Sequence, residues 1–227
     1  MIIRRYINFE KFVYLLKEGL FCPKSSLLED QWEGLIAPSA EMIKATSINN
    51  FAKAREWIYL SCWHTEPDES YAMWKIYGEH EFSVCVETAS TKIDELFTKY
   101  NSSDAVYSGK VEYHKPSNKY ESVVTNVLRE KVAFVKNGLW TYATHHLTKH
   151  IAYQFEKEYR AIIIDKKFNL DLQNTLPGIT LKINPMEIID AVIVSPRAPD
   201  WFYNIVQDIL NKYEVNVRVT KSKLELP

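Results

Sequence analysis

The chain has 227 residues, of which 46% are hydrophobic and 25% are charged. This length and composition are sufficient for a buried core, and they exclude intrinsic disorder and a fibrous protein. The formal net charge of −1 excludes the broad basic surface of a protein that grips a long stretch of duplex nucleic acid, and leaves room only for a local basic groove.

The N-terminal segment and the cysteines indicate the cellular compartment of the protein. The apolar run at the N-terminus is interrupted by Asn8, Glu10 and Lys11, so it does not form a signal peptide, and no segment has the length of a membrane span. The three cysteines are odd in number and have no C-x-x-C spacing, which argues against a disulfide framework and a Cys-rich zinc site. We therefore expect a soluble cytoplasmic protein with no membrane partner.

The first half of the chain alternates between apolar strands and helices with apolar periodicity. Asn8 is a helix-capping residue, and Gly19 and Gly78 mark helix ends. In chain order the expected elements are a strand over 2–7, a helix from Asn8 to Gly19, a helix from about 39 to 56, a strand over 57–63, a helix between Pro67 and Gly78, a strand over 82–87 and a helix over 92–99.

The second half is richer in strands, which cluster instead of alternating regularly with helices. No internal repeat or Pro/Gly/Ser-rich linker divides the chain, so the sequence predicts one compact α+β domain over residues 1–227. The expected elements are a strand over 107–113, a helix over 120–138, long strands over 154–165 and 188–194, a helix from Pro199 through Tyr213 and a strand over 215–219.

A short charged segment around residue 158 is the strongest candidate for chemistry. On an extended strand, residues two apart share a face, so Glu156, Glu158 and Arg160 project together. Two carboxylates and a guanidinium in a row can hold a ribose and position a nucleophile. The alternative is a solvated sheet face with a surface ion pair worth at most about 1 kcal/mol.

Two aromatic segments upstream are candidates for a ligand cleft. The strand over 57–63 carries Ser61 between two aromatic side chains, where its hydroxyl either orients a carboxylate on a neighbouring strand or bonds to its own backbone. On the next helix, Trp74 and Tyr77 are three residues apart and therefore adjacent on the helix surface. They form either part of the core or a stacking wall for a flat heteroaromatic ligand.

Histidines give a weak metal signal. His146 and His150 have the i, i+4 spacing of two zinc ligands on one helix, but no glutamate stands beside His146 as in the metalloprotease motif. The chain also lacks the serine-hydrolase elbow, the Walker A loop and the glycine-rich dinucleotide fingerprint. A metal-dependent nuclease or hydrolase is therefore a minor alternative, and we expect no metal.

Six segments together resemble the bacterial family called domain of unknown function 2971, over nearly the whole chain. The most specific feature is the pair of motifs C-W-H and M-W-K-x-Y, followed further along by E-x-E-x-R. One departure is Gln31, where the family often has proline, and this leaves the shape of that loop open. The segments are Arg5-Tyr6, Asp30 to Gly34, Ser61 to His64, Ala72 to Tyr77, Glu156 to Arg160 and Val194 to Phe202.

The order of three residue types also resembles the arginine, serine and glutamate signature of toxin-like ADP-ribosyltransferases. Arg5 lies on the first predicted strand, Ser61 on a mid-chain strand and Glu158 on a later one. The resemblance implies that NAD is bound, with the arginine at its phosphates or ribose, the serine steadying the glutamate, and the glutamate at the nicotinamide ribose. Arg4 is the alternative arginine. The implied fold is a split mixed and antiparallel β-sandwich with helices around an NAD cleft.

The same resemblance implies further roles around the glutamate. Positive charge builds on the sugar as the nicotinamide–ribose bond breaks, so a fixed Glu158 carboxylate stabilises the transition state. Glu156 orients or deprotonates the acceptor. The cofactor-binding set is Arg5, Trp74, Tyr77 and Arg160, with one of the aromatic rings stacked on nicotinamide.

The implied partners are a macromolecular acceptor, protein or nucleic acid, and an antitoxin or chaperone, as in bacterial toxin–antitoxin or phage-defence systems. The competing hypothesis is a non-enzymatic binding or regulatory module. In that module the charges around residue 158 form an ion-pair ladder, and the two aromatic rings belong to the core.

Overall fold

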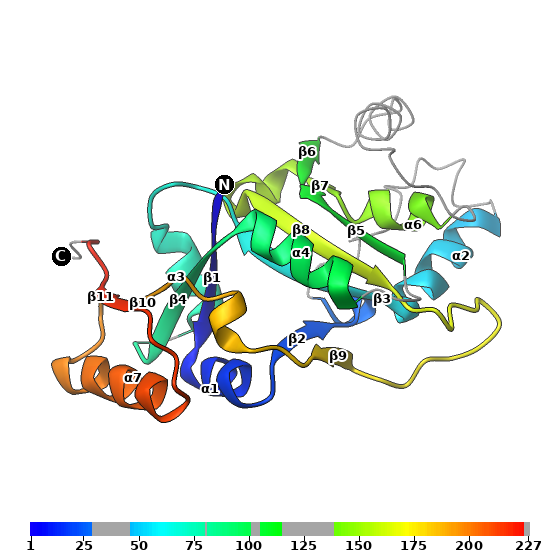
Figure 1. The fold of residues 1–227 in the computed structure, drawn as a ribbon. Coiled ribbons are helices and arrows are strands. Elements are labelled where there is room, and N and C mark those ends of the chain that lie inside the picture. The colour runs from blue at the N-terminus through cyan, green and yellow to red at the C-terminus, as the bar shows by residue number, and fades with distance from the viewer. Residues whose placement is uncertain (29–45, 80, 101–104, 115–138, 225–227) are drawn as a thin grey trace. The chain divides into compact units, whose positions relative to one another are not determined.

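The computed structural model describes residues 1–28, 46–79, 81–100, 105–114 and 139–224 (Figure 1). The chain divides into two compact units, each assembled from segments that are distant in the sequence. Unit 1 comprises residues 1–21, 62–96 and 180–227, and unit 2 comprises residues 22–61 and 97–179. Four elements cross these boundaries: β2 (Leu20–Pro23), β3 (Ile58–His64), α4 (Ser90–Tyr100) and β9 (Gly178–Leu181).

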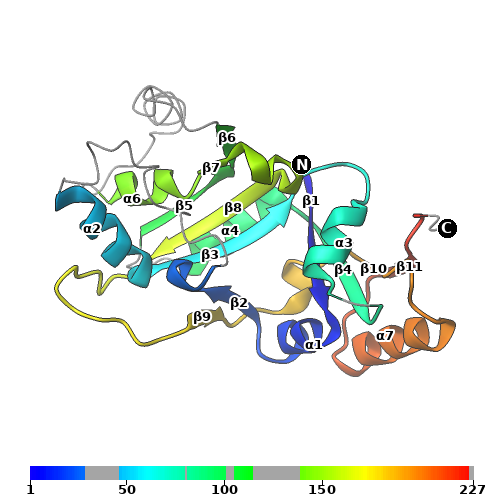
Figure 2. The ribbon, with the colours of Figure 1, turned by 180° about the vertical axis from the view of Figure 1, so that it is seen from behind.

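Unit 1 is built on β1, which pairs along its whole length with β4. The strand order is β11-β10-β4-β1-β3, antiparallel except for the parallel pair β10 and β11. Helices α1 and α7 lie side by side (Figures 1 and 2), with the rings of Phe9 and Phe202 5.2 Å apart. The elements are β1 (Ile2–Asn8), α1 (Phe9–Lys17), α3 (Tyr71–Tyr77), β4 (Ser83–Ala89), a 3₁₀ turn (Pro185–Glu187), β10 (Ala191–Val194), α7 (Asp200–Lys212) and β11 (Arg218–Lys221).

The start and end of α1 follow from its sequence. Asn8 caps the helix, because its side-chain oxygen accepts a hydrogen bond from the backbone N–H of Lys11 at 3.0 Å. Gly19 follows the helix with a φ of 113°, and a Cβ there would lie 2.2 Å from the carbonyl oxygen of Leu181. Both the backbone angle and the close approach therefore require glycine at this position.

Unit 2 contains the strand order β3-β8-β5. Strand β8 is buried along its whole length, and its apolar end is antiparallel to β5. Helices α2 and α6 are adjacent (Figure 2): the centroid of the Phe51 ring lies 4.9 Å from that of Tyr142 and 4.4 Å from that of His145. The elements are α2 (Thr46–Ala54), β5 (Ala105–Lys110), β6 (Glu112–His114), α6 (Trp140–His145), β7 (Thr148–His150), β8 (Glu158–Ile164) and 3₁₀ turns at Ser25–Leu27, Arg55–Trp57 and Ile151–Glu156.

The predicted α+β class is confirmed. The described residues place seven strands in the main sheet, mostly antiparallel, together with several helices. None of the described helices combines the length and the apolar character needed to cross a bilayer. The expectation of one domain over the whole chain stays a prediction.

Several predicted boundaries were wrong. The strand expected over 154–165 begins only at Glu158, because residues 151–156 form a 3₁₀ turn and Lys157 has a left-handed φ of 41°. The strand over 107–113 is divided into β5 and β6, and the two C-terminal strands are shorter or shifted. Strands β2, β7 and β9 and helix α6 were not predicted. The helix expected over 120–138 lies outside the described residues.

Candidate active site

Four charged side chains meet at the start of β8 in unit 2. The guanidinium Nε of Arg160 donates a hydrogen bond to Oε2 of Glu158. The ammonium of Lys149, on β7, donates to Oε2 of Glu156 and lies 3.3 Å from Oε1 of Glu158. We call these four residues the carboxylate cluster. It holds two carboxyl groups and two cations, with Lys149 between the carboxyls.

The carboxylate cluster is buried. Glu156 is 3% exposed, Glu158 5% and Arg160 1%. A solvated face with a surface ion pair was the alternative considered for these residues, and this burial excludes it. Charges removed from water at this depth interact far more strongly than they do on a surface.

The local backbone explains how Glu156 reaches the carboxylate cluster. Glu158 and Arg160 share a face of β8 by strand alternation, as predicted. Glu156 is not on that strand; it ends the 3₁₀ turn, and the left-handed Lys157 joins the turn to β8. The two carboxyl groups therefore meet through a turn and not through the two-residue repeat of a strand.

The two carboxyl groups have opposite pKa shifts. Burial, reinforced by the hydrogen bond to Glu158 and its negative charge, raises the pKa of Glu156 to about 7, and the Lys149 ammonium offsets this only in part. Burial also disfavours the charged form of Glu158, but the Arg160 guanidinium, Glu156 and Lys149 outweigh it and hold the pKa of Glu158 well below its usual range. Near neutral pH, Glu158 is therefore an anion and Glu156 exchanges its proton.

Neighbouring groups hold the carboxylate cluster in place. The second arm of Arg160 donates to the backbone carbonyl of His146 at 2.8 Å. The hydroxyl of Tyr113 accepts the backbone N–H of Glu158 at 2.9 Å, and burial raises the pKa of Tyr113, so the hydroxyl stays protonated. These contacts hold the backbone of Glu158 and the side chain of Arg160 in place.

His146 is itself fixed by a hydrogen-bonded chain. Its Nδ1 lies 2.8 Å from the carbonyl oxygen of Tyr142, and its Nε2 lies 2.7 Å from the Ser25 hydroxyl. Burial lowers the pKa of His146 to about 3, so the imidazole is neutral. Both ring nitrogens are occupied, which argues against a metal-binding role. His146 and His150 also do not share a helix, because α6 ends at His145 and His150 belongs to β7.

Ser61 lies on β3, the strand beside β8 in the sheet. Strands β3 and β8 run antiparallel (Figures 1 and 2), and the N–H of Asp165 bonds to the carbonyl of Trp57 at 2.9 Å. Ser61 is fully buried. Its expected role in steadying Glu158 stays a prediction, and the contacts described above hold Glu158 through Arg160 and Lys149.

The two candidate arginines lie in unit 1 and face opposite sides of β1. Arg4 is 8% exposed and is fully engaged by Glu87 and by the backbone carbonyls of residues 66 and 67. Arg5 is half-buried; its guanidinium carbon lies 5.8 Å from the Trp63 ring centroid, and it donates a long 3.4 Å bond to the carbonyl of Phe21. Arg5 is thus the more exposed of the two arginines.

The two aromatic side chains of α3, also in unit 1, have different environments. Trp74 is 5% exposed, packs at 4.9 Å from the Tyr6 ring and also lines a pocket. Tyr77 is 37% exposed and does not line that pocket. A core role is therefore excluded for Tyr77. Trp74 packs in the core and also forms part of the pocket wall.

Lys149 and Tyr113 are the members of this site that sequence reasoning missed. Neither is related to Glu158 by a helical or strand repeat, because Lys149 comes from β7 and Tyr113 from β6, two paired strands outside the main sheet. In the sequence, Lys149 stands between two histidines, and this arrangement has no distinguishing pattern. Only the fold brings these residues to the carboxylate cluster.

Comparisons with known proteins bear on the family. Residues 73–161 match the model of a family described as "Protein of unknown function (DUF2971)". The family resemblance expected from the sequence is confirmed over these residues, which include all four residues of the carboxylate cluster. The chain is also similar to a solved structure, Thermus sp. 2.9 DarT in complex with NAD+, with a TM-score of 0.42 and 8% identity over 98% of this chain and 95% of that chain. A search of curated proteins gives no match.

Proposed function

We propose that this protein cleaves the bond between nicotinamide and ribose in NAD and transfers ADP-ribose to a macromolecular acceptor. The single observation that carries the proposal is the pair of adjacent buried carboxyl groups whose pKa values are driven apart. Pairs of titratable groups in this condition supply separate acid–base and charge-stabilising roles in enzymes. The sequence resemblance to arginine–serine–glutamate transferases gives the reaction class.

Each carboxyl has a distinct step. As the C1′–N bond breaks, its electron pair leaves with neutral nicotinamide, and positive charge develops on the ribose. The permanently ionised Glu158, held by Arg160 and Lys149, stabilises that charge most in the transition state. The acceptor then forms a bond to C1′, and its proton passes to the Glu156 carboxylate.

The remaining expected roles belong to the same proposal. The sequence resemblance gives Arg5 the role of binding the NAD phosphates. The acceptor is a protein or a nucleic acid, and a toxin or phage-defence role with an antitoxin or chaperone partner follows from the resemblance.

A binding or regulatory module is the second candidate, and the closure of the carboxylate cluster favours it. All four charged side chains are at most 6% exposed, with their charges satisfied internally. In that case the cluster is a buried ion-pair network that specifies the fold of unit 2.

Incubation of the full chain with labelled NAD and cell extract separates the two candidates. The transferase releases nicotinamide and leaves label on a macromolecule, whose digestion by protease or nuclease identifies the acceptor class. Glu158→Gln stops both signals, whereas Asp171→Asn, the same chemical change at an exposed position of unit 2, leaves them intact. Unlabelled macromolecules and no nicotinamide release would support the binding module.

A further inference from the structure

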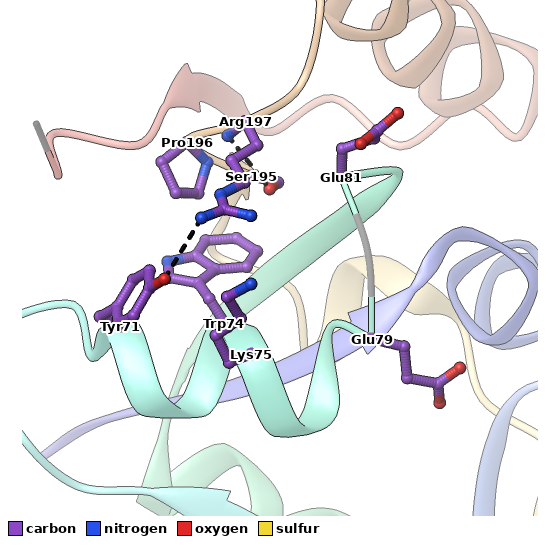
Figure 3. Close-up of a pocket in the computed structure, with 8 residues that line it drawn as sticks. All are labelled: Tyr71, Trp74, Lys75, Glu79, Glu81, Ser195, Pro196 and Arg197. Carbon is purple, nitrogen blue, oxygen red and sulfur yellow. Dashed lines mark hydrogen bonds between the residues drawn. The ribbon is translucent and has the colours of Figure 1, made fainter. Parts of the chain in front are cut away.

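Unit 1 contains a pocket of about 250 Å³ between α3 and the segment after β10 (Figure 3). Helix α3 contributes Tyr71, Trp74 and Lys75, and the S-P-R segment contributes Ser195 and Arg197. Whole small-molecule ligands generally occupy roughly 300–1,000 Å³. The pocket is therefore large enough for one end of a ligand and not for a dinucleotide.

The pocket contains two cations without carboxylate partners. Neither Lys75 nor Arg197 forms an ion pair within the part of the chain that the structure describes. Figure 3 shows both cationic ends beside the Trp74 indole. Unpaired like charges at one concavity attract an anion.

The two acidic residues at the pocket edge do not neutralise these cations. The carboxylates of Glu79 and Glu81 point away from the basic side chains in Figure 3. Glu79 is already bound, since Lys11 donates to its Oε1 at 2.7 Å and Asn8 to its Oε2 at 3.0 Å. The two cations, and not these carboxylates, therefore lie beside the Trp74 ring in the pocket.

The walls of the pocket are fixed before any ligand arrives. Trp74 donates its indole N–H to Glu69 at 3.1 Å, and Arg197 donates to the hydroxyl of Tyr71 at 3.3 Å. The backbone N–H of Arg197 also bonds to the Ser195 hydroxyl at 3.4 Å. Tyr71 is 44% exposed, so it retains surface for a further contact. A preorganised site loses less entropy on binding.

We propose that this pocket binds the phosphoryl group of a small aromatic phosphomonoester, such as a nucleoside monophosphate, with the ring of the ligand against Tyr71. A phosphomonoester carries a charge close to −2 at neutral pH, which matches Lys75 and Arg197 together. The arginine fork suits the phosphate oxygens, and the lysine acts as a point charge. The proposal goes beyond the NAD chemistry and uses none of the four residues of the carboxylate cluster.

Calorimetric titration of the full chain with AMP and with inorganic phosphate tests the pocket. Wild type is expected to bind AMP, and Lys75→Gln and Arg197→Gln are each expected to weaken that binding about tenfold or more. Lys212→Gln, which removes an exposed charge from α7, serves as the matched control and leaves the affinity unchanged. Circular dichroism confirms that the variants are folded.

Two further results decide the details. Glu158→Gln is expected to retain AMP binding, because Glu158 does not line the pocket. The AMP titration therefore tests the pocket even if the NAD proposal fails. No AMP binding by wild type, or equal AMP binding by wild type and both pocket variants, overturns the site. Equal affinity for AMP and inorganic phosphate overturns the ring contact with Tyr71.

Discussion

The two units each bury an arginine against a glutamate, with different chemistry in each. In unit 1, Arg4 places Nε and Nη2 at 3.1 Å and 2.9 Å from one Glu87 oxygen, and its remaining donor bonds to two backbone carbonyls. In unit 2, Arg160 meets Glu158, but Glu156 and Lys149 join them. The first arrangement has one carboxylate, whose other oxygen lies 3.6 Å from the exposed Arg218. The second has two carboxyl groups, of which one exchanges its proton near neutral pH.

This difference separates a structural ion pair from a candidate catalytic one. Arg4 and Glu87 stand on the neighbouring strands β1 and β4, so the expected role of this pair is to hold the two strands together. Two carboxyl groups with opposite pKa shifts can carry two roles in one reaction. Substitutions in the two clusters are therefore expected to affect different properties.

The largest effect is expected for Glu158→Gln. Loss of the fixed negative charge is expected to lower nicotinamide release about a thousandfold, because the group acts mainly in the transition state. The fold is expected to persist, since Glu156 then ionises more readily and remains beside Lys149. Single-turnover kinetics with NAD and a thermal unfolding curve measure the two properties; unchanged turnover would remove Glu158 from the mechanism.

Arg4→Gln is expected to reduce stability and not chemistry. Among the described residues, removing Arg4 leaves Glu87 with only the 3.6 Å contact to the exposed Arg218, and loss of one partner of a buried pair costs about 3 to 5 kcal/mol. Urea unfolding of Arg4→Gln, Glu87→Gln and the double variant gives the cost and the coupling between the two residues. A loss below about 1 kcal/mol for Arg4→Gln would show that the pair behaves as a surface contact.

Glu156→Gln is expected to lower transfer to the acceptor by about a hundredfold, as general-base loss does. In wild type the rate is expected to rise as the pH passes through about 7, because the ionised form of Glu156 is the base. This rise disappears in the variant. A rate–pH curve that is the same in both proteins would rule out Glu156 as the base.

The raised pKa of Glu156 also predicts how stability depends on pH. The unfolded chain ionises this carboxyl near its ordinary pKa of 4.5, whereas burial raises the pKa in the folded protein to about 7. The folded state therefore binds more protons in this window, and the contribution of Glu156 to stability falls as the pH rises. The free energy of unfolding of wild type and of Glu156→Gln, measured in urea between pH 4.5 and about pH 7, isolates the contribution of Glu156.

The smallest effect is expected for Asn8→Ala, which removes the cap of α1 and costs about 1 kcal/mol. Its amide also donates to Glu79, so the observed loss includes that contact. Urea unfolding measures the cost, and Asn8→Ser, which retains a capping oxygen, is expected to recover most of it. Equal losses in the two variants would show that the cap contributes nothing.

Local chemistry made much of this fold predictable. The apolar residues of β1, the Asn8 cap and the apolar run of β8 carry their own signals, and the structure bears them out. The carboxylate cluster was predictable only in part, because strand alternation links Glu158 to Arg160 but not to Glu156. Glu156 reaches the cluster through the left-handed residue Lys157, and Lys149 comes from a separate strand. No sequence periodicity reveals either of these two features.

Carbon-13 NMR of the glutamate carboxyl groups, titrated in the full chain, tests the central claim most directly. The account predicts one carboxyl titrating near pH 7, absent in Glu156→Gln and shifted to lower pH in Glu158→Gln, where the neighbouring negative charge is gone. Titration of every glutamate below about pH 5 would contradict the account. Survival of the high-pH signal in Glu156→Gln would contradict the assignment to Glu156.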